Sequence, residues 1–164
     1  MVARECGIRP IAIMGLESDK ARFELAKKFG VDSTVNIDRE DPVYAVPNIL
    51  GGHPDVVIET SGAPSAIQTA LTLVKPTGRV VTIGVSGGKE TSIKFDTLVN
   101  KGVTIVAGGG QAGNWQDAMR IINSRKYPVE EISNFKYSLE ELPKALEETA
   151  HPPEGFIKGV VVFD

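Results

Sequence analysis

Short apolar segments recur along the chain at intervals that suit strands separated by helices. Five have strand length, at residues 11–14, 56–59, 79–83, 103–107 and 157–163. A brief further strand is expected at residues 33–36. The five are rich in valine and isoleucine and show no regular alternation of apolar and polar positions. Strands covered on both faces of a parallel sheet have this pattern. The pattern therefore predicts a buried parallel sheet.

Helical patterns fill the spaces between these strands. The predicted helices cover a last helical turn in residues 1–7 and then residues 18–30, 41–50, 65–74, 114–123 and a segment that begins at residue 138. Ser18 can cap the first long helix, and Gly30 can end it. Ser138 and Glu141 have capping-box spacing, whereas Pro47 would kink or break its helix. This βαβα alternation predicts one α/β domain over residues 1–164, a doubly wound parallel sheet in a three-layer α/β/α arrangement.

Composition and charge exclude several classes of function. The net charge is −3 and the basic residues are scattered, so we expect no nucleic-acid partner. No apolar run approaches the roughly 20 residues that span a membrane, and the first residues carry no apolar signal-peptide region. Cys6 is the one cysteine, which excludes an internal disulfide and fits a reducing cytoplasm. Without a cluster of cysteine and histidine, we expect no structural zinc site in the chain.

Small residues follow three of the predicted strands. The second long apolar run ends in Thr60-Ser61-Gly62, the third in "IGVSGG" and the fourth in "VAGGGQAG". Ligands of open α/β sheets bind beyond the carboxyl ends of the strands, and glycine lets a backbone approach them closely. The three ends together favour a groove for a planar cofactor. The alternative is that the glycines only close ordinary strand-to-loop turns.

Two charged positions have a functional and a structural interpretation. Glu17 or Asp19, after the first apolar run, could bind the ribose hydroxyls of an adenosine, or could simply stabilise the start of a helix. Lys158 lies within the last apolar run, where its ammonium could meet a pyrophosphate or could reach solvent from an edge strand. The residues alone leave Glu17 open and favour the structural interpretation for Lys158.

Four segments together resemble one known family. They are "KARFELAKKFGVDSTVN", "DVVIETSGAPSAIQTAL", "LVKPTGRVVTIGV" and "GFIKGVVVFD", in the order and spacing of the cofactor-binding domain of medium-chain, zinc-dependent alcohol and sorbitol dehydrogenases. The resemblance covers essentially the whole chain and implies a Rossmann-like fold. It also implies an oxidoreductase that transfers a hydride between an alcohol or polyol and NAD, with NADP as the other cofactor to consider.

The resemblance assigns roles to individual residues. Thr60 and Ser61 would lie by the adenosine and nicotinamide ribose, and Lys158 on the pyrophosphate, which reverses the preference stated above. Ile83, Gly84 and Val85 would line the nicotinamide, and Gly108 and Gly109 would offer backbone groups to its carboxamide. Residues 91–94 (Thr91, Ser92, Ile93 and Lys94) match a strand through which related enzymes form dimers.

The chain also departs from the family pattern. The Gly-rich turn and first strand of the family are absent from this sequence, as is the catalytic domain with its zinc ligands, so we expect no catalytic or metal-binding residue here. The usual acidic residue after the second strand is replaced by Gly15, with Glu17 two positions later. A carboxylate disfavours a further phosphate charge, so Glu17 favours NAD over NADP.

The absent strand has a physical consequence that the structure can test. It is central in the family's sheet, so without it the remaining strands would separate into a pair and a larger group. Unpaired backbone groups at the new edges would cost about 1–3 kcal/mol each, so we expect the polypeptide alone to be marginally stable or associated. The alternative function is a non-catalytic module that binds a dinucleotide or dimerises.

Overall fold

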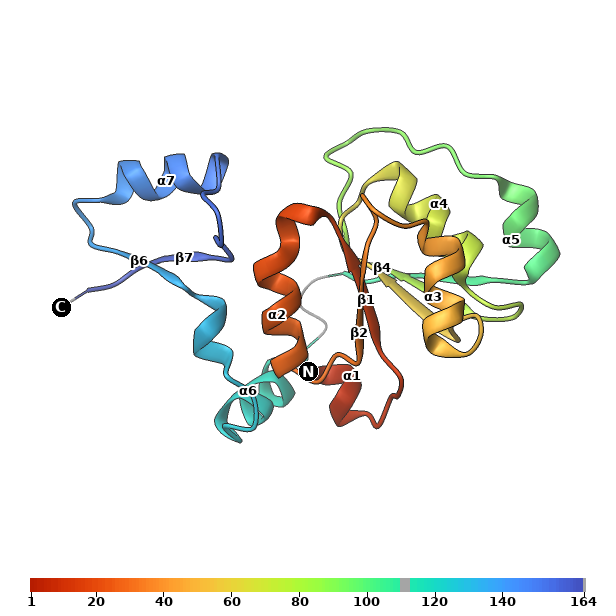
Figure 1. The fold of residues 1–164 in the computed structure, drawn as a ribbon, viewed down its shortest axis with the longest axis horizontal. Coiled ribbons are helices and arrows are strands. Elements are labelled where there is room, and N and C mark those ends of the chain that lie inside the picture. The colour runs from red at the N-terminus through yellow and green to blue at the C-terminus, as the bar shows by residue number, and fades with distance from the viewer. Residues whose placement is uncertain (110–112, 164) are drawn as a thin grey trace. The chain divides into compact units, whose positions relative to one another are not determined.

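The computed structural model describes residues 1–109 and 113–163, which form two compact units (Figure 1). Unit 1 combines Met1–Asp38 with Trp115–Asp164, and unit 2 is the continuous stretch Arg39–Asn114. Every strand pairs in parallel with its neighbour and within its own unit. The α/β class expected from the sequence is therefore confirmed.

The first part of unit 1 is a parallel strand pair with a crossover helix. Its elements are α1 (Val2–Glu5), β1 (Ala12–Gly15), the 3₁₀ turn η1 (Glu17–Asp19), α2 (Lys20–Lys28) and β2 (Ser33–Asn36). Phe23 and Leu25 of α2 and Val35 of β2 are buried. Gly30 has φ +86°, a left-handed conformation that ends the helix as expected. The expected cap at Ser18 is wrong, because Ser18 lies within η1 and the N-cap residue of α2 is Asp19.

A second strand pair forms the C-terminal part of unit 1. It contains α6 (Trp115–Asn123), η2 (Val129–Ile132), β6 (Phe135–Tyr137), α7 (Leu142–Ala150) and β7 (Gly159–Val161). Figure 1 shows α7 as the crossover between β6 and β7. The Ser138 N–H donates to the Glu141 carboxylate at 3.0 Å, which is one half of the expected capping box.

Side chains from both ends of the chain meet in unit 1. The Glu5 carboxylate accepts hydrogen bonds from the Tyr127 hydroxyl at 2.7 Å and from Lys126 at 2.6 Å. The ring of Phe29 stacks on that of Tyr127 with centroids 5.8 Å apart. These contacts tie α1 and the end of α2 to the segment after α6.

Unit 2 is a parallel three-stranded sheet in the order β3-β4-β5. Its elements are α3 (Pro42–Leu50), β3 (Val56–Glu59), α4 (Pro64–Leu73), β4 (Arg79–Thr82), α5 (Phe95–Lys101) and β5 (Thr104–Ala107). A cluster of fully or nearly fully buried residues, Ala70, Leu71, Val74 and Val80, packs α4 against the sheet. The N-cap of α3 is Asp41, which accepts the Val43 N–H at 2.9 Å, and the helix continues through Pro47. At the C-terminal end of α4, the Lys101 ammonium donates hydrogen bonds to the carbonyls of Leu71 and Thr72.

The strands divide as the resemblance implied. β1 and β2 form one sheet, and β3, β4 and β5 form another. These are the pair and the larger group expected without the family's central strand. β6 and β7 add a further pair that the sequence patterns did not predict as such. The expected marginal stability stays a prediction.

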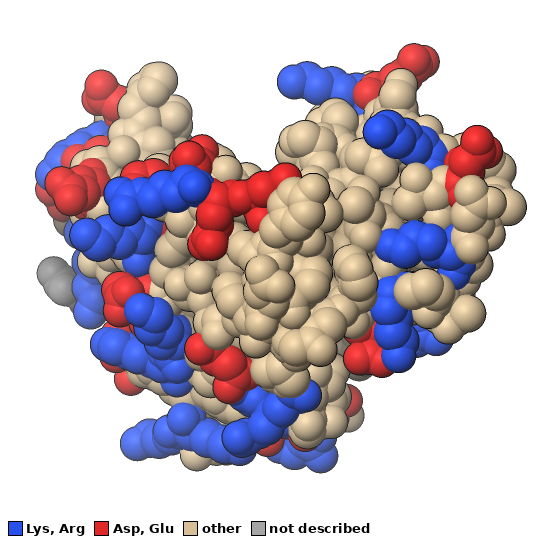
Figure 2. Space-filling model, turned by 45° about the vertical axis from the view of Figure 1, so that its right-hand side comes forward, with Lys and Arg blue, Asp and Glu red and all other residues tan. Residues whose placement is uncertain are grey.

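The surface carries both signs of charge and several exposed apolar residues. On the face in Figure 2, acidic and basic side chains are interspersed around a broad uncharged area. None of the residues of α6 is buried, although Trp115, Met119 and Ile122 lie along one side of it. Cys6 is exposed as well. No helix in the described ranges is long and apolar enough to cross a membrane.

Candidate functional site

The sheet of unit 2 brings the three glycine-bearing turns together. Glu59 pairs with Thr82, and Thr82 pairs with Ala107, so the three strands end at one level. The turns that begin at Thr60, Ile83 and Gly108 directly follow these residues. Parallel strands place their carboxyl ends on the same edge, which is where open α/β sheets bind ligands. The juxtaposition expected from the sequence is thus present within this unit.

Two of these turns touch through their backbones. A β-carbon on Gly84 would lie 2.0 Å from the Gly62 nitrogen, and one on Gly62 would lie 2.4 Å from the Val85 carbonyl oxygen. Gly62 also has φ +71°, which L-residues rarely adopt. Both glycines are therefore required by the packing of one turn on the other. Packing of the turns is therefore enough to explain why glycine occupies both positions, and it requires no ligand.

Larger side chains of the same turns face solvent. Thr60 and Ser61 are exposed, and so are Ile83 and Val85, the latter with 87% of its surface accessible. Apolar side chains at the end of a sheet are costly to leave in water unless something covers them. Hydroxyls beside apolar groups are the lining that ligand sites of this type use.

The third turn, which begins at Gly108, has fewer free backbone donors than expected. The Gly108 N–H donates to the Thr82 carbonyl at 2.8 Å, so this donor is already used within the sheet. The contact expected between the backbone groups of this turn and a carboxamide stays a prediction. Gly109 has open space where its β-carbon would be. The remaining glycine of the "GGG" run, Gly110, lies outside the described residues.

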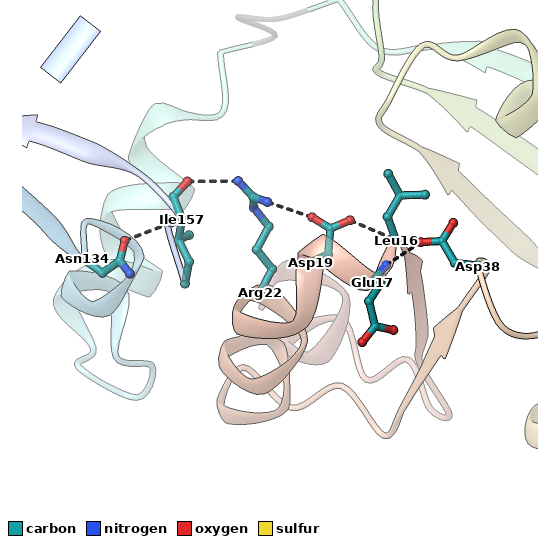
Figure 3. A network of polar contacts seen from close by, with 7 residues as sticks. All are labelled: Leu16, Glu17, Asp19, Arg22, Asp38, Asn134 and Ile157. Carbon is teal, nitrogen blue, oxygen red and sulfur yellow. Dashed lines mark hydrogen bonds and ion pairs between the residues drawn. The ribbon is translucent and has the colours of Figure 1, made fainter. Parts of the chain in front are cut away.

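Glu17 lies at the carboxyl end of β1, in unit 1. Its N–H donates to the Asp38 carboxylate at 2.7 Å, and its carboxylate accepts a hydrogen bond from the Asn36 amide. Asn36 is brought there because it pairs with Gly15 across the strands. Asp19 lies two residues further along in η1, so three acidic residues, Glu17, Asp19 and Asp38, lie at this end of the pair (Figure 3). Such a group creates a negative potential that disfavours a further anion.

Lys158 lies immediately before β7 rather than within it. The ladder between β6 and β7 begins at the pair Phe135–Gly159, so Lys158 is excluded from the strand that the sequence predicted. Its carbonyl accepts the Phe135 N–H at 3.3 Å. Its side chain is exposed, and within the described part of the chain its ammonium has no ion-pair partner. That position leaves the ammonium accessible to an anion.

A polar network links the Lys158 loop to the start of α2 in unit 1 (Figure 3). The Asn134 side chain accepts the Ile157 N–H at 3.0 Å and donates to the Gly155 carbonyl at 2.8 Å. Arg22 donates to the Ile157 carbonyl at 3.4 Å and pairs with Asp19 at 2.8 Å. Sequence reasoning missed Arg22 and Asn134, because their contacts with Gly155 and Ile157 join residues more than 20 positions apart.

The expected dimer strand is not a strand in this chain. Residues 91–94 carry no strand assignment, although Ile93 packs against the core and the Lys94 N–H donates to the Gln68 side chain at 2.8 Å. A strand is recognised by its ladder to a neighbour. A segment that pairs with a second copy therefore has no ladder in a single chain.

The residues fit a dinucleotide better than a metal ion. Within the described residues no three histidine, cysteine, aspartate or glutamate side chains are grouped so that they could hold a metal ion. A zinc site therefore does not fit the residues that the structure describes. By contrast, the turns of unit 2 contain glycines, which allow a flat ligand to approach the backbone closely, and carry exposed side chains that could contact it.

Comparisons with known proteins agree with this description. A profile of zinc-binding dehydrogenases matches residues 1–124. L-threonine 3-dehydrogenase of Pyrococcus furiosus is 36% identical over 140 residues, which are 83% of this chain and 39% of that protein. Sorbitol dehydrogenase of Halalkalibacterium halodurans is 26% identical over 137 residues, 82% of this chain and 40% of that protein.

A solved structure shows the same fold. A short chain alcohol dehydrogenase from E. coli, complexed with NADH, superimposes with a TM-score of 0.85 over 99% of this chain and 47% of its own, at 17% identity. The Rossmann-like fold expected from the resemblance is thereby confirmed. The chain spans about two fifths of the length of the curated relatives it matches. By the extent of the profile match and its likeness to the threonine dehydrogenase, the chain belongs to the zinc-binding dehydrogenase family.

Proposed function

We propose that the chain is the nicotinamide dinucleotide-binding domain of an oxidoreductase that transfers a hydride between an alcohol or polyol and its cofactor. The observation that carries this proposal is the pair of packed turns at the ends of β3 and β4, with Thr60, Ser61, Ile83 and Val85 exposed on them. Family membership supports it independently. The proposal assigns no catalytic group and no zinc ligand to residues of this chain.

Unit 2 would hold the nicotinamide half of the cofactor. The Thr60 hydroxyl can donate to ribose oxygens, whereas the Ser61 hydroxyl already donates to Glu59. Ile83 and Val85 can cover an aromatic ring and exclude water from one of its faces. Gly109 would leave room for the carboxamide. The nicotinamide, when bound, supplies or accepts the hydride.

Unit 1 has its own candidate residues for an adenosine ribose and a pyrophosphate. Glu17 would accept hydrogen bonds from the adenosine ribose hydroxyls, and Lys158 would pair with the pyrophosphate. The carboxylates of Asp19 and Asp38 add negative charge near Glu17, so NAD is the proposed cofactor and NADP the weaker one.

The binding of cofactor tests the proposal directly. NADH is titrated into the 164-residue chain and followed by its fluorescence, with an unrelated protein of similar size as the control. We expect saturable binding that unlabelled NAD competes away, and a weaker response for Lys158→Ala and Glu17→Ala. Binding no stronger than that of the unrelated protein, with both variants unchanged, would refute the proposal.

We further propose a cytoplasmic homodimer that pairs through residues 91–94. The lone cysteine supports the compartment, and the segment's lack of strand partners in one chain supports the pairing. Sedimentation of the wild-type chain and of Ile93→Pro checks the dimer, because proline removes a backbone donor. A dimer that persists in the variant would place the interface elsewhere.

A further inference from the structure

Glu59 is a buried carboxylate at the end of β3. Its side chain is 5% exposed, and it is the one charged residue among those described that is buried. It has no ion-pair partner within the described ranges. A buried carboxylate without a cation is costly unless hydrogen bonds satisfy it. The donors that satisfy Glu59 therefore reveal its role.

The carboxylate is satisfied by the turn that follows it. Oε1 accepts the Ser61 N–H at 2.7 Å, the Ser61 hydroxyl at 2.5 Å and the Gly62 N–H at 3.0 Å. Oε2 lies 3.1 Å from the same Gly62 nitrogen. The Ser61 hydroxyl oxygen in turn accepts the Ala63 N–H at 3.1 Å. One side chain thus fixes the backbone of residues 61–63.

The main chain of Glu59 holds the neighbouring turn. Its carbonyl accepts the Ile83 N–H at 2.7 Å and the Gly84 N–H at 3.2 Å. A β-carbon on Gly84 would lie 2.8 Å from Glu59 Oε2, so the carboxylate also supports the second turn from beneath. Both turns are therefore organised by the same residue, one through its side chain and the other through its carbonyl.

We propose that Glu59 is a positioning residue for the nicotinamide half of the cofactor site. It fixes the geometry of the turns that carry Thr60, Ser61, Ile83 and Val85, without contacting the cofactor itself. This inference rests on the proposed cofactor function for its consequence in binding, but the restraint of the two turns can be measured without a ligand.

Amide hydrogen exchange in the full chain tests the restraint. Glu59→Gln keeps the size of the side chain but replaces one acceptor oxygen by an NH₂ group, which cannot accept the N–H donors of the turn. We expect the Ser61 and Gly62 amides, which donate to the carboxylate, to exchange about tenfold faster, the effect of losing one hydrogen bond to a charged group. The Leu71 amide, in the core of α4, and all amides of the control Glu40→Gln should keep their rates. Unchanged rates at residues 61 and 62 would overturn the proposal.

A binding arm separates positioning from mere stability. NADH titrations are made where urea unfolding shows wild type and Glu59→Gln fully folded. We expect roughly tenfold weaker binding and a smaller shift of NADH emission at saturation for the variant, with Glu40→Gln like wild type. A variant that loses stability yet binds NADH as wild type does would overturn the positioning role.

Two other experimental outcomes also decide between the proposals. Wild-type chain that binds no NADH refutes the proposed function, and the exchange rates alone then decide whether Glu59 restrains the turns. If Glu59→Gln does not fold, Ser61→Ala replaces it, because it removes the hydroxyl donor and keeps the carboxylate. Faster exchange at Gly62 and Ala63 supports the proposal in that variant, and unchanged rates overturn it.

Discussion

The backbones of Gly62 and Gly84 are in direct contact: a β-carbon on Gly84 would lie 2.0 Å from the Gly62 nitrogen. The atom in the way is main chain, so no change of rotamer could relieve the overlap. The turns after β3 and β4 therefore form one backbone layer. Any side chain at position 84 must push the two strand ends apart.

Gly84→Ala should destabilise unit 2. Overpacking of this kind costs about 1–3 kcal/mol, and the rigid backbone contact places the expected loss at the upper end. Urea unfolding monitored by circular dichroism measures the change in the free energy of unfolding. Gly109→Ala is the matched control, because nothing lies within 4 Å of its β-carbon position. Equal stability of the two variants would contradict the packing argument.

Glu17→Gln should weaken the preference for NAD over NADP. The change removes one of the charges that would repel a 2′-phosphate, while the Asp38 carboxylate still accepts the N–H of residue 17. We expect the ratio of the NADP and NAD dissociation constants to fall by about tenfold, as for the loss of one close charge interaction. Competitive titration against NADH gives both constants. Glu24→Gln, at an exposed pair with Lys27, should leave the ratio unchanged.

Tyr137 should ionise well above the ordinary range of a tyrosine. Burial, followed by its hydrogen bond to Glu148, raises the pKa of Tyr137 from 10.0 to about 12. Because the folded pKa is raised, the associated stability is present below pH 10.0 and is lost as the pH rises through about 12. Phenolate absorbance in Tyr137→Phe should lack the latest step. Tyr127→Phe is the comparison, since a hydrogen bond to Glu5 and burial also raise the pKa of Tyr127. A late step that survives in Tyr137→Phe would belong to another group.

Asp32 should contribute to acid unfolding of unit 1. The Ile11 N–H bonded to its carboxylate, and then Arg4, hold the pKa of Asp32 below its usual 3.8. A lowered folded pKa gives stability above pH 3.8 that is lost as the pH falls through the folded value. The melting temperature of Asp32→Asn should therefore depend less on pH below about 4 than that of wild type. Identical pH profiles would show that the Asp32 carboxylate contributes nothing to acid unfolding.

Regular elements with strong local signals could be predicted from the sequence. The strands at residues 33–36 and 56–59 have the predicted bounds, because turn residues frame both segments. α3 was predicted as well, and its Pro47 is accommodated within the helix. α5 and β6 were missed, since one is a short helix without a marked cap and the other has three residues.

The sequence predicted which turns form the candidate site, but not which residues hold those turns in place. The small residues after each strand identified the turns, because backbone approach depends on local sequence. Glu59 was missed as their support, although an acid that ends an apolar run just before Thr-Ser-Gly was a usable signal. The contacts of Arg22 and Asn134 join chain segments that only folding brings together, so no local sequence pattern predicts them.

The division of the chain has a consequence for the order of folding. Unit 2 is one continuous stretch, whereas unit 1 joins residues from both sides of it. During synthesis unit 2 can complete its contacts once residue 114 is available, but unit 1 must wait for the segment that begins at Trp115. Closing unit 1 across that insertion carries a loop-closure cost that a finished unit 2 reduces, since a compact insert spans its ends more closely than an unfolded one. We therefore expect pulse-labelled hydrogen exchange to show protection of β4 before protection of β1.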